Sequence, residues 1–375
     1  MIHNDTYQIY QRQINLPGFG IEAQARLLDA HVLIIGAGGL GCPILQYLAA
    51  AGVGHITLID FDNVEQSNLH RQILFGAADV GQPKAIVAAE RIKVLHPHIH
   101  IVPINAAINQ SNVFDLIEQV DLVIDGSDNF FTRYLVNDAC VLLNKPLIYG
   151  SIYRFEGQVG VFNLKLSDGN TSHYRHFFPL PPGKNEVPNC SEAGVIGVLP
   201  GMIGIMQATE AIKVLTGIGK PLYNTLLTYD ILQNRWYELN VLPYMIPPGY
   251  MPETLDELCS FSYPDFCSHS MIPELSFEEF MQQYTRKPHK FQLIDVRELH
   301  ELPPVSTLPC TQIPLSELMN RMEEISKDIS VIFICQSGKR SRDAVGLYLS
   351  QRPKAVAYSL LGGIIQCTTL YNKAL

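Results

Sequence analysis

The sequence lacks the features of several large classes of protein. No stretch reaches the ~18 consecutive apolar residues of a membrane span, and the first residues show neither the basic start nor the apolar run of a secretory signal. Acidic residues outnumber basic residues, which gives a formal net charge of -9. This charge argues against sequence-independent nucleic-acid binding. The eight cysteines are scattered rather than clustered as in a disulfide framework. We expect a cytoplasmic protein with reduced thiols and with neither membrane nor nucleic acid as a partner.

At 375 residues, of which 47% are hydrophobic and 17% charged, the chain is predicted to fold into two domains. Short apolar runs alternate with helical patterns in the first 150 residues, which predicts an α/β fold with a Rossmann-like, doubly wound, mostly parallel sheet. The predicted strands are 32–35, 55–59, 100–103, 122–124 and 146–149, and the predicted helices are 43–51, 84–95 and 131–144.

Later segments complete this picture. We expect a strand at 158–164, a buried helix at 201–216 and a hairpin of 226–230 with 235–238. Five prolines interrupt residues 243–272, which we predict to be a linker. The domains are therefore 1–242 and 273–375. In the second, strand and helix alternate again over 292–295, 315–324, 331–334, 342–349 and 355–359.

The predicted strand 32–35 ends in a turn rich in glycine, formed by Gly36, Gly38, Gly39 and Gly41. Glycines allow a tight turn and a close backbone approach, and the following helix presents N–H groups to a phosphate. Asp60 follows at the end of the next strand, where a carboxylate can accept ribose hydroxyls. Taken alone, this pattern is typical of a dinucleotide-dependent oxidoreductase, or of a turn that is merely structural.

Two polar clusters follow neighbouring strands. The first contains Asp62, Asn68, Arg71 and Gln72 with Lys84 behind it, and the second contains Asp125, Asp128 and Asn129. Because open parallel sheets bind ligands at the carboxyl ends of their strands, both clusters should converge on the glycine turn. Attack of a carboxylate on a phosphate brings negative charges together, so cations at one crevice suit that reaction. Taken singly, each cation could be a solvated charge, and Asp128 could be a turn residue.

At this point the sequence resembles the ubiquitin-activating-type adenylyltransferases of the ThiF/MoeB/HesA family. The resemblance covers residues 7 to 242 and is based on segments 12–13, 16–20, 36–41, 60–62, 68–72, 81–84, 128–130, 132–134 and 190–195. It implies ATP-dependent adenylation of the C-terminal Gly-Gly of a small ubiquitin-like sulfur-carrier protein.

The resemblance also implies roles for individual residues. The four glycines would face the phosphates, with Asp62, Gln72 and Asn129 also in the nucleotide site, and Asp60 would hold the ribose. Asn68, Arg71 and Lys84 would neutralise the phosphates. Asp128 would hold Mg²⁺. Arg12 would reach into the partner subunit's site, which implies a homodimer.

Cys190 lies in a polar, glycine-containing segment before the predicted helix 201–216. In the family this loop can cross the adenylate site, so Cys190 is a candidate nucleophile, with a small semi-buried cysteine as the alternative. Cys42 and Cys140 fall at apolar positions of predicted helices, and we expect both in the core.

The two Cys-x-x-Cys pairs that hold structural zinc in many relatives are missing. His173 and His176 stand where the first is expected, and Cys259 and Cys267 follow the position of the second. A rebuilt site from these four residues is conceivable. We favour two surface histidines and no structural zinc.

The predicted strand 331–334 ends at Cys335, followed by Gln336-Ser337-Gly338-Lys339-Arg340-Ser341. Successive backbone N–H groups of this loop, with Lys339 and Arg340, would favour a thiolate and stabilise a persulfide. Segments 293–298, 313–315, 335–341 and 361–363 resemble a rhodanese domain, in which Arg340 would orient an anionic donor. Asp295 and Arg297 more plausibly brace the domain through an ion pair. The alternative is a phosphatase, since Cys335 and Arg340 have Cys-x5-Arg spacing.

Together the motifs predict an adenylyltransferase with a sulfurtransferase domain. Cys335 would be loaded by an upstream persulfide donor such as a cysteine desulfurase, and the product would be a carrier thiocarboxylate. Molybdopterin and thiamine biosynthesis are among the candidate pathways. The alternatives are adenylation of a peptide or small acid, and a scaffold that binds nucleotide without turnover.

Overall fold

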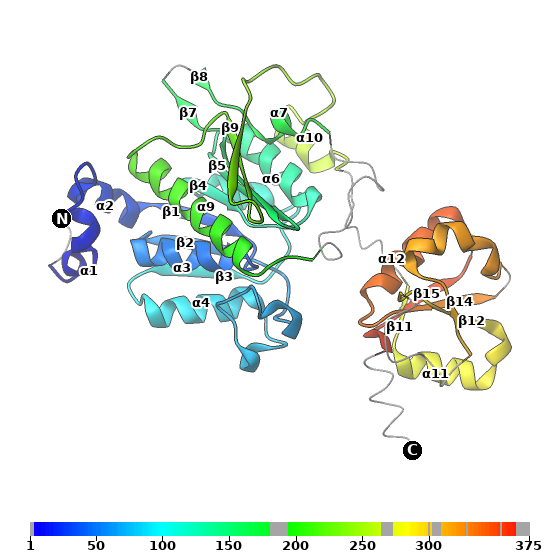
Figure 1. Cartoon of the computed structure of the whole chain (residues 1–375). Coiled ribbons are helices and arrows are strands. Elements are labelled where there is room, and N and C mark those ends of the chain that lie inside the picture. The colour runs from blue at the N-terminus through cyan, green and yellow to red at the C-terminus, as the bar shows by residue number, and fades with distance from the viewer. Residues whose placement is uncertain are drawn as a thin grey trace. The chain divides into compact units, whose positions relative to one another are not determined.

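The computed structural model describes residues 4–167, 169–180, 194–263, 273–298, 301, 309–327, 329–352 and 355–364. It divides into two compact units, Met1–Cys267 and Ser268–Leu375. Figure 1 shows that helices flank a sheet in each of them.

The first unit is an α/β structure. Its elements are α1 Asn4–Ile14, α2 Gly20–Asp29, β1 His31–Ile35, α3 Gly41–Ala51, β2 His55–Ile59, η1 Gln66–Asn68, η2 Ala77–Asp79, α4 Lys84–Leu95, β3 His100–Ile104, α5 Val113–Glu118, β4 Leu122–Asp125, α6 Phe130–Leu142, β5 Leu147–Tyr153, β6 Glu156–Phe162, β7 Lys165–Leu166, β8 Gly169–Asn170, α7 Tyr174–Phe177, α9 Val198–Thr216, β9 Thr225–Asp230, β10 Arg235–Asn240 and α10 Leu255–Ser260.

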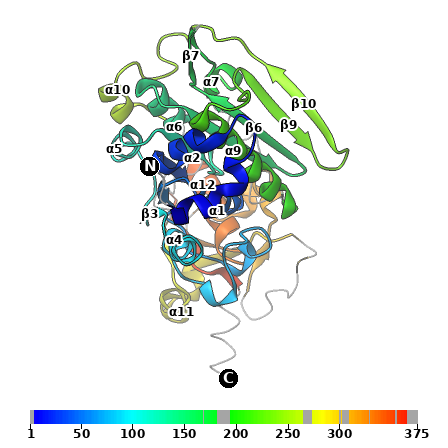
Figure 2. The ribbon, with the colours of Figure 1, turned by 90° about the vertical axis from the view of Figure 1, so that its left-hand side faces the viewer.

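Its main sheet has eight strands in the order β10-β9-β6-β5-β4-β1-β2-β3. Strands β1 to β5 pair in parallel, whereas β6, β9 and β10 add antiparallel strands on the β5 side. Figure 2 shows the β9–β10 hairpin at that edge. Strands β2 and β3 lie on one side of β1 and β4 and β5 on the other, so the strand order reverses between β1 and β4, which is where open α/β sheets bind their ligands. The predicted Rossmann-like sheet is therefore confirmed.

Alternate residues of the central strands face two hydrophobic cores, as the period-2 geometry of a strand requires. Val32 and Ile34 of β1 pack in the core with α3 and α9, while Leu33 and Ile35 pack in the core with α6. Helix α9 is long and apolar enough to cross a membrane by length and composition alone. It nevertheless contains the ion pair of Glu210 with Lys213, and it packs against α3, β5 and β6 as the core helix that its sequence predicts.

The second unit is a smaller α/β structure. Its elements are β11 Glu274–Leu275, α11 Phe277–Arg286, η3 Pro288–Lys290, β12 Phe291–Asp295, β13 Thr311–Gln312, η4 Leu315–Glu324, β14 Ser330–Ile334, α12 Lys339–Gln351 and β15 Ala357–Leu360. The sheet order is β11-β15-β14-β12-β13, with parallel pairing throughout. Helix α12 and η4 pack in one core, and α11 contributes Phe280 to the other.

The predicted linker at 243–272 differs from the structure in its middle part. Helix α10 forms within it, and Leu258 and Tyr263 are buried in the core with α6. The side chain of Thr254 caps α10 by accepting a hydrogen bond from the Glu257 N–H at 3.2 Å. Prolines delimit this helix without preventing it, because none lies inside it. Residues 264–272 lie outside the described part of the chain.

Candidate active sites

The turn between β1 and α3 depends on contacts that only glycine permits. Gly36 has φ of +91°, and a Cβ atom there would lie 3.0 Å from the carbonyl oxygen of Gly126. A Cβ atom at Gly41 would lie 1.9 Å from the carbonyl oxygen of Gly36. Leu40, which precedes α3, provides no side-chain cap. The helix N-terminus behind this turn is therefore suited to an anionic ligand.

Asp60, at the end of β2, is tied to the glycine turn by its side chain. Its Oδ2 accepts a hydrogen bond from the N–H of Ala37 at 2.7 Å, and its Oδ1 accepts one from the N–H of Asp62 at 2.8 Å. Burial raises the pKa of Asp60, an effect that the positive charge of Lys84 opposes. Each oxygen keeps a second lone pair, so Asp60 can still accept ribose hydroxyls.

Lys84 opens α4 beside these carboxylates. It is only 5% exposed, and its Nζ lies 2.8 Å from Oδ2 of Asp62, whose side chain is half exposed. Because lysine is rarely buried without a partner, this ion pair explains how a cation is kept in the crevice. A ligand with more negative charge than Asp62 would compete for the same ammonium group.

The predicted phosphate-facing residues of the first cluster also come together. Asn68 and Gln72 are buried, and Nε2 of Gln72 lies 3.8 Å from where a Cβ on Gly38 would be. Arg71 passes beside Gly39 and donates from Nη1 to the carbonyl oxygen of Ser67 at 3.0 Å. Oε1 of Gln72 is buried and has no hydrogen-bond partner among the described residues, so the turn leaves an unused acceptor.

The second cluster adjoins the glycine turn, as predicted. The Gly126 N–H donates to the carbonyl oxygen of Ile35 at 2.9 Å, which joins the ends of β4 and β1. Asp125 is 1% exposed, and burial raises its pKa. Asp128 is exposed, while Asn129 caps α6 by accepting from the Thr132 N–H at 2.8 Å. The cap engages the side-chain oxygen of Asn129, while its NH2 group can still donate a hydrogen bond.

Two predicted site residues are not part of the crevice that the structure describes. Arg12 is exposed near the end of α1, and no hydrogen bond or ion pair joins it to the crevice in the described ranges. Cys190 lies outside the described residues. The roles of both stay predictions. Cys42 and Cys140 are fully buried in the two cores, as expected, and burial raises the pKa of Cys42 to about 12.

The expectation of surface histidines at 173 and 176 is wrong, because both are at most 9% exposed. Nδ1 of His176 accepts from the His173 N–H at 2.9 Å, and its Nε2 lies 2.8 Å from the Tyr244 carbonyl oxygen. Both ring nitrogens of His176 are thus committed, which leaves no lone pair for a metal. Cys259 is exposed, Cys267 and His269 lie outside the described residues, and the described part of the chain contains no group of three metal-binding side chains. Among the described residues, His176 is therefore not available as a zinc ligand.

In the second unit, Cys335 ends β14 and lies in a small cradle of donors. Its Sγ accepts hydrogen bonds from the N–H groups of Gly338 at 3.2 Å and Ser341 at 3.3 Å, and the Ser341 hydroxyl lies 3.5 Å away. Cys335 is 1% exposed. The predicted ring of successive N–H groups is thus represented by these two among the described residues. Gly363 is required behind the loop, because a Cβ there would lie 2.4 Å from the carbonyl oxygen of Cys335.

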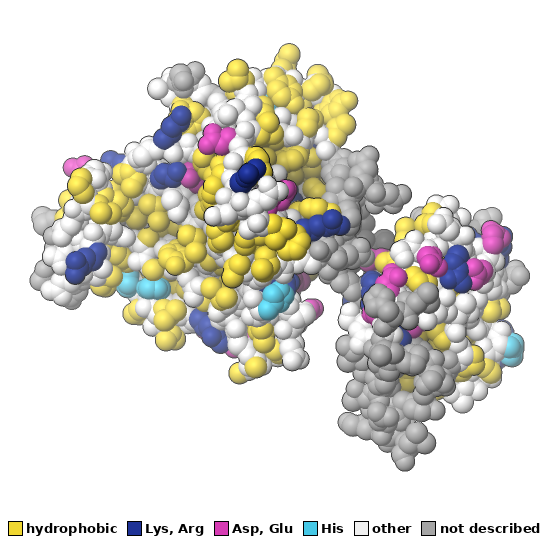
Figure 3. Space-filling model, viewed as in Figure 1, with side chains coloured by type: hydrophobic (Ala, Val, Ile, Leu, Met, Phe, Trp, Pro, Cys, Tyr) yellow, Lys and Arg dark blue, Asp and Glu magenta, His cyan; other side chains and the backbone are white. Residues whose placement is uncertain are grey.

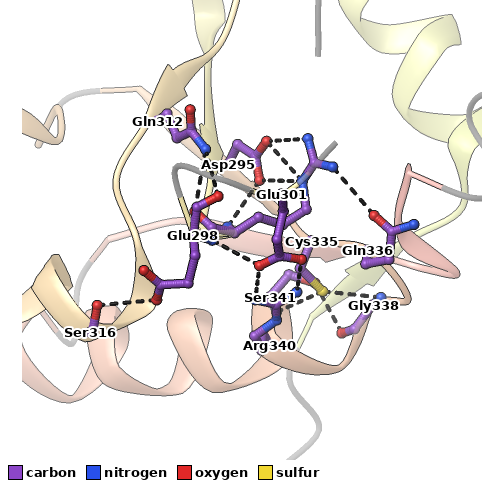
Figure 4. Close-up of polar contacts among 11 residues, drawn as sticks. Asp295, Glu298, Glu301, Gln312, Ser316, Cys335, Gln336, Gly338, Arg340 and Ser341 are labelled. Carbon is purple, nitrogen blue, oxygen red and sulfur yellow. Dashed lines mark hydrogen bonds and ion pairs between the residues drawn. The ribbon is translucent and has the colours of Figure 1, made fainter. Parts of the chain in front are cut away.

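The arginines around this loop are paired with carboxylates (Figure 4). The predicted brace is present: Arg297 and Asp295 form a buried ion pair at 2.8 Å. Arg340, which was predicted to orient an anionic donor, also pairs with a carboxylate. Its guanidinium donates to both carboxylate oxygens of Glu301, with Nη2 2.7 Å from Oε2. Sequence reasoning overlooked Glu301 because the two residues are 39 positions apart in the chain.

Gln207 on α9 was also missed. Its Nε2 donates to the carbonyl oxygen of Asp125 at 2.7 Å, which fixes the end of β4. Its own Oε1 and the Oδ2 of Asp125 are buried without a hydrogen-bond partner in the described ranges. A glutamine in an apolar helix was the only signal, and the fold was needed to show that it reaches the crevice.

Comparison with known proteins identifies the family of the chain. Residues 10–245 match the ThiF family. The chain belongs to the ThiF family. A ThiF-family relative, the sulfur carrier protein adenylyltransferase of Thermus thermophilus, is 51% identical over 233 residues, which are 62% of this chain and 86% of the relative.

Two relatives of this ThiF-family chain span both units. The probable adenylyltransferase/sulfurtransferase MoeZ of Mycobacterium tuberculosis is 40% identical over 361 residues, covering 95% of this chain and 91% of the relative. The adenylyltransferase and sulfurtransferase MOCS3 of Drosophila sechellia is 38% identical over 383 residues, covering 96% and 83%. The chain is accordingly an enzyme with adenylyltransferase and sulfurtransferase activities, as the motifs predict.

Solved structures agree on the fold. E. coli MccB in complex with MccA-N7isoASN aligns with a TM-score of 0.56 and 24% identity, over 64% of this chain and 74% of that chain. This likeness shows the Rossmann-like ThiF fold alone. Membership in the ThiF family of adenylyltransferases implies that ATP is the nucleotide.

Proposed function

We propose that this ThiF-family enzyme adenylates the C-terminal glycine of a small ubiquitin-like sulfur carrier and then transfers sulfur to it from Cys335. The observation that carries the proposal is one chain with both an anion-binding crevice flanked by Lys84 and a cysteine held in a cradle of N–H groups. The relatives named as adenylyltransferase and sulfurtransferase, and the one named for a sulfur carrier protein, support it.

In the first step a carboxylate oxygen of the carrier attacks the α-phosphorus of ATP, and pyrophosphate leaves. The turn from Gly36 to Gly41 receives the phosphates, and Asp60 receives the ribose. Lys84 and Arg71 neutralise charge as pyrophosphate departs, which is the main form of catalysis open to phosphoryl chemistry. Asp62 holds the Lys84 ammonium in place until the nucleotide arrives.

The carboxylate of Asp128 is the candidate ligand for Mg²⁺. It is exposed at the end of β4, next to the buried Asp125, and a carboxylate oxygen is the ligand that this ion prefers. When bound, the ion would neutralise phosphate oxygens and hold them in position. Asp128 itself would orient the triphosphate relative to the glycine turn.

In the second step, Cys335 first receives sulfur from a protein persulfide such as that of a cysteine desulfurase. The terminal sulfur of the Cys335 persulfide then attacks the acyl carbon, and AMP leaves. The resulting acyl disulfide is broken when a thiolate attacks the Cys335 sulfur, which releases the thiocarboxylate and leaves a disulfide. Cys190 is a candidate for that thiolate, or for a transient thioester.

The surface of the first unit suits protein partners. Figure 3 shows hydrophobic side chains gathered on the face of α9 and the β9–β10 hairpin, where Trp236, Tyr237 and Leu239 are exposed. Apolar surface of this kind is typical of protein interfaces. We propose the carrier and a second copy of the chain as partners, with Arg12 completing the other subunit's site, and a cytoplasmic location.

The test is ATP–pyrophosphate exchange with a carrier ending in Gly-Gly, with the same carrier lacking its last glycine as control. Exchange with the intact carrier only is expected. Cys335→Ala should abolish thiocarboxylate formation and leave exchange unchanged. Absence of exchange with every Gly-Gly carrier, by a folded enzyme, would end the proposal. Equal loss of both activities in Cys335→Ala would contradict the division of labour.

A further inference from the structure

The arginine at the mouth of the sulfur loop is already occupied. Arg340 presents both terminal nitrogens to both oxygens of Glu301, and the two side chains are 27% and 25% exposed. A bidentate fork uses the geometry that would otherwise receive a small anion. The other arginines in this region are also paired, Arg297 with Asp295 and Arg342 with Glu274, at 2.8 and 2.7 Å.

Glu301 is held in place rather than meeting Arg340 by chance. Its Oε1 accepts a hydrogen bond from the Glu298 N–H at 2.9 Å, and its own N–H donates to the Glu298 carbonyl oxygen at 3.0 Å. The Ser316 hydroxyl donates to the side chain of Glu298 at 3.2 Å. Figure 4 shows the Glu301 carboxylate directed toward the Cys335 loop. Hydrogen bonding to Arg340 lowers the pKa of Glu301 to about 2, so the carboxylate is ionised at neutral pH.

These contacts bear on the choice of sulfur donor. An inorganic donor such as thiosulfate is a dianion, and it would have to displace Glu301 from Arg340 while approaching Glu298 as well. The two carboxylates would repel the dianion. Both terminal nitrogens of the Arg340 guanidinium already bind Glu301, so they do not offset this repulsion. A donor protein places its persulfide sulfur through its own surface contacts, so it does not need that fork.

We propose that Glu301 is a specificity residue that blocks small anionic sulfur donors at Arg340 and reserves Cys335 for a persulfide carried on a protein. The inference rests on the proposed sulfur-transfer function. Loading by a protein persulfide moves one sulfur atom to the Cys335 thiolate and leaves a thiolate on the donor. Loading by thiosulfate moves the same atom and releases sulfite, so neither route needs an added oxidant or reductant.

The test compares wild type with Glu301→Gln, an isosteric change that removes the charge. The measurements are the thiosulfate kinetics of sulfur transfer to cyanide and the mass gain of one sulfur atom on Cys335. Glu301→Gln should lower the KM for thiosulfate and raise kcat/KM about tenfold, with little change in kcat. Glu274→Gln is the matched control, because it releases a similarly exposed arginine of the same helix outside the mouth. It should stay within about twofold of wild type.

Loading from a cysteine desulfurase supplied with cysteine distinguishes the role of Glu301 from the sulfur-transfer function itself. If the desulfurase loads both proteins and Glu301→Gln gains nothing with thiosulfate, the role of Glu301 is refuted and the sulfur-transfer function stands. If neither donor loads wild type, both are refuted.

Should Glu301→Gln fail to fold, the salt dependence of wild type decides the question. If the carboxylates beside Cys335 repel thiosulfate, kcat/KM for thiosulfate should rise with salt concentration, because salt screens that repulsion. A fall with salt would mean that Arg340 attracts the dianion, which would overturn the proposal.

Discussion

Replacing Asp138 with asparagine should destabilise the first unit strongly. The carboxylate accepts hydrogen bonds from Arg175 at 2.8 and 2.6 Å, from Tyr263 at 2.9 Å and from Asn137 at 2.9 Å. The side chains of Asp138 and Arg175 are 0% and 2% exposed. An amide would face the guanidinium with a donor group and would leave its charge uncompensated. Removing one partner of a buried ion pair costs about 3–5 kcal/mol. This is a large share of the free energy of unfolding, which is typically about 5–15 kcal/mol.

Urea denaturation can measure this loss in the first unit alone. The chain has one tryptophan, Trp236, which stacks on Tyr229 in the β9–β10 hairpin, so its fluorescence reports that unit. Arg91→Gln is the control, since Arg91 is 44% exposed in its pair with Asp79 and its loss should cost no more than about 1 kcal/mol. A loss below about 1 kcal/mol for Asp138→Asn would refute the reasoning.

A chelator extends the same test. Arg175 and Tyr263 join α7 and the segment after α10 to α6 through Asp138, in the region where a rebuilt zinc site was considered from the sequence. Treatment of the wild type with a chelator should therefore leave the Trp236 unfolding midpoint unchanged. A lower midpoint that zinc restores would show that a metal holds this region after all.

Three further changes test the sites and the buried histidines. Lys84→Ala should reduce ATP–pyrophosphate exchange about 100-fold or more but spare loading of Cys335, whereas Lys93→Ala, exposed on the same helix, should leave both intact. Gly363→Ala should impair sulfur transfer and leave exchange unchanged, because the new Cβ meets the Cys335 carbonyl oxygen; normal transfer would contradict the cradle. Burial lowers the pKa of His173 to about 3, so the unfolded state binds its proton first as the pH falls below about 6.5. Stability should drop by about 2 kcal/mol by about pH 5 in urea titrations, and His173→Gln should flatten the slope.

Elements were predicted well where an apolar run and a residue that marks its start point to the same boundaries. The strand at 55–59 and the helix at 84–95 match β2 and α4 residue for residue, because Gly54 and Pro83 mark their starts and each has an apolar run to bury. The convergence of the glycine turn with Asp125–Asn129 followed from the topology of a parallel sheet. Such inferences need only neighbouring strands, not distant side chains.

What sequence reasoning missed depends on contacts between distant segments. His173 and His176 sit in a polar stretch that is typical of a surface, and their burial requires Asp138 to neutralise Arg175 from 37 residues away. Helix α10 is too short for a hydrophobic period, and its place depends on packing against α6. The pairing of Glu301 with Arg340 likewise required the fold of the second unit.

Separating the two units should abolish neither activity. Only the step that needs both units should come to depend on enzyme concentration. Each unit has its own hydrophobic cores, in the first unit around β1 and in the second around β14, so each should remain folded after the chain is cut. We would insert a protease site at the boundary between Cys267 and Ser268 and compare the enzyme before and after cleavage. Exchange should be unchanged.

Thiocarboxylate formation should become dependent on enzyme concentration after the cut, because a covalent connection supplies an effective concentration of about millimolar that free units at micromolar levels cannot match. Adding excess free second unit should restore the rate, and the same unit with Cys335→Ala should not. If cleavage leaves the rate unchanged at low micromolar enzyme, the persulfide does not reach the adenylate through its covalent connection. The units would then meet through a stable interface, or Cys335 would serve the carrier of another enzyme molecule.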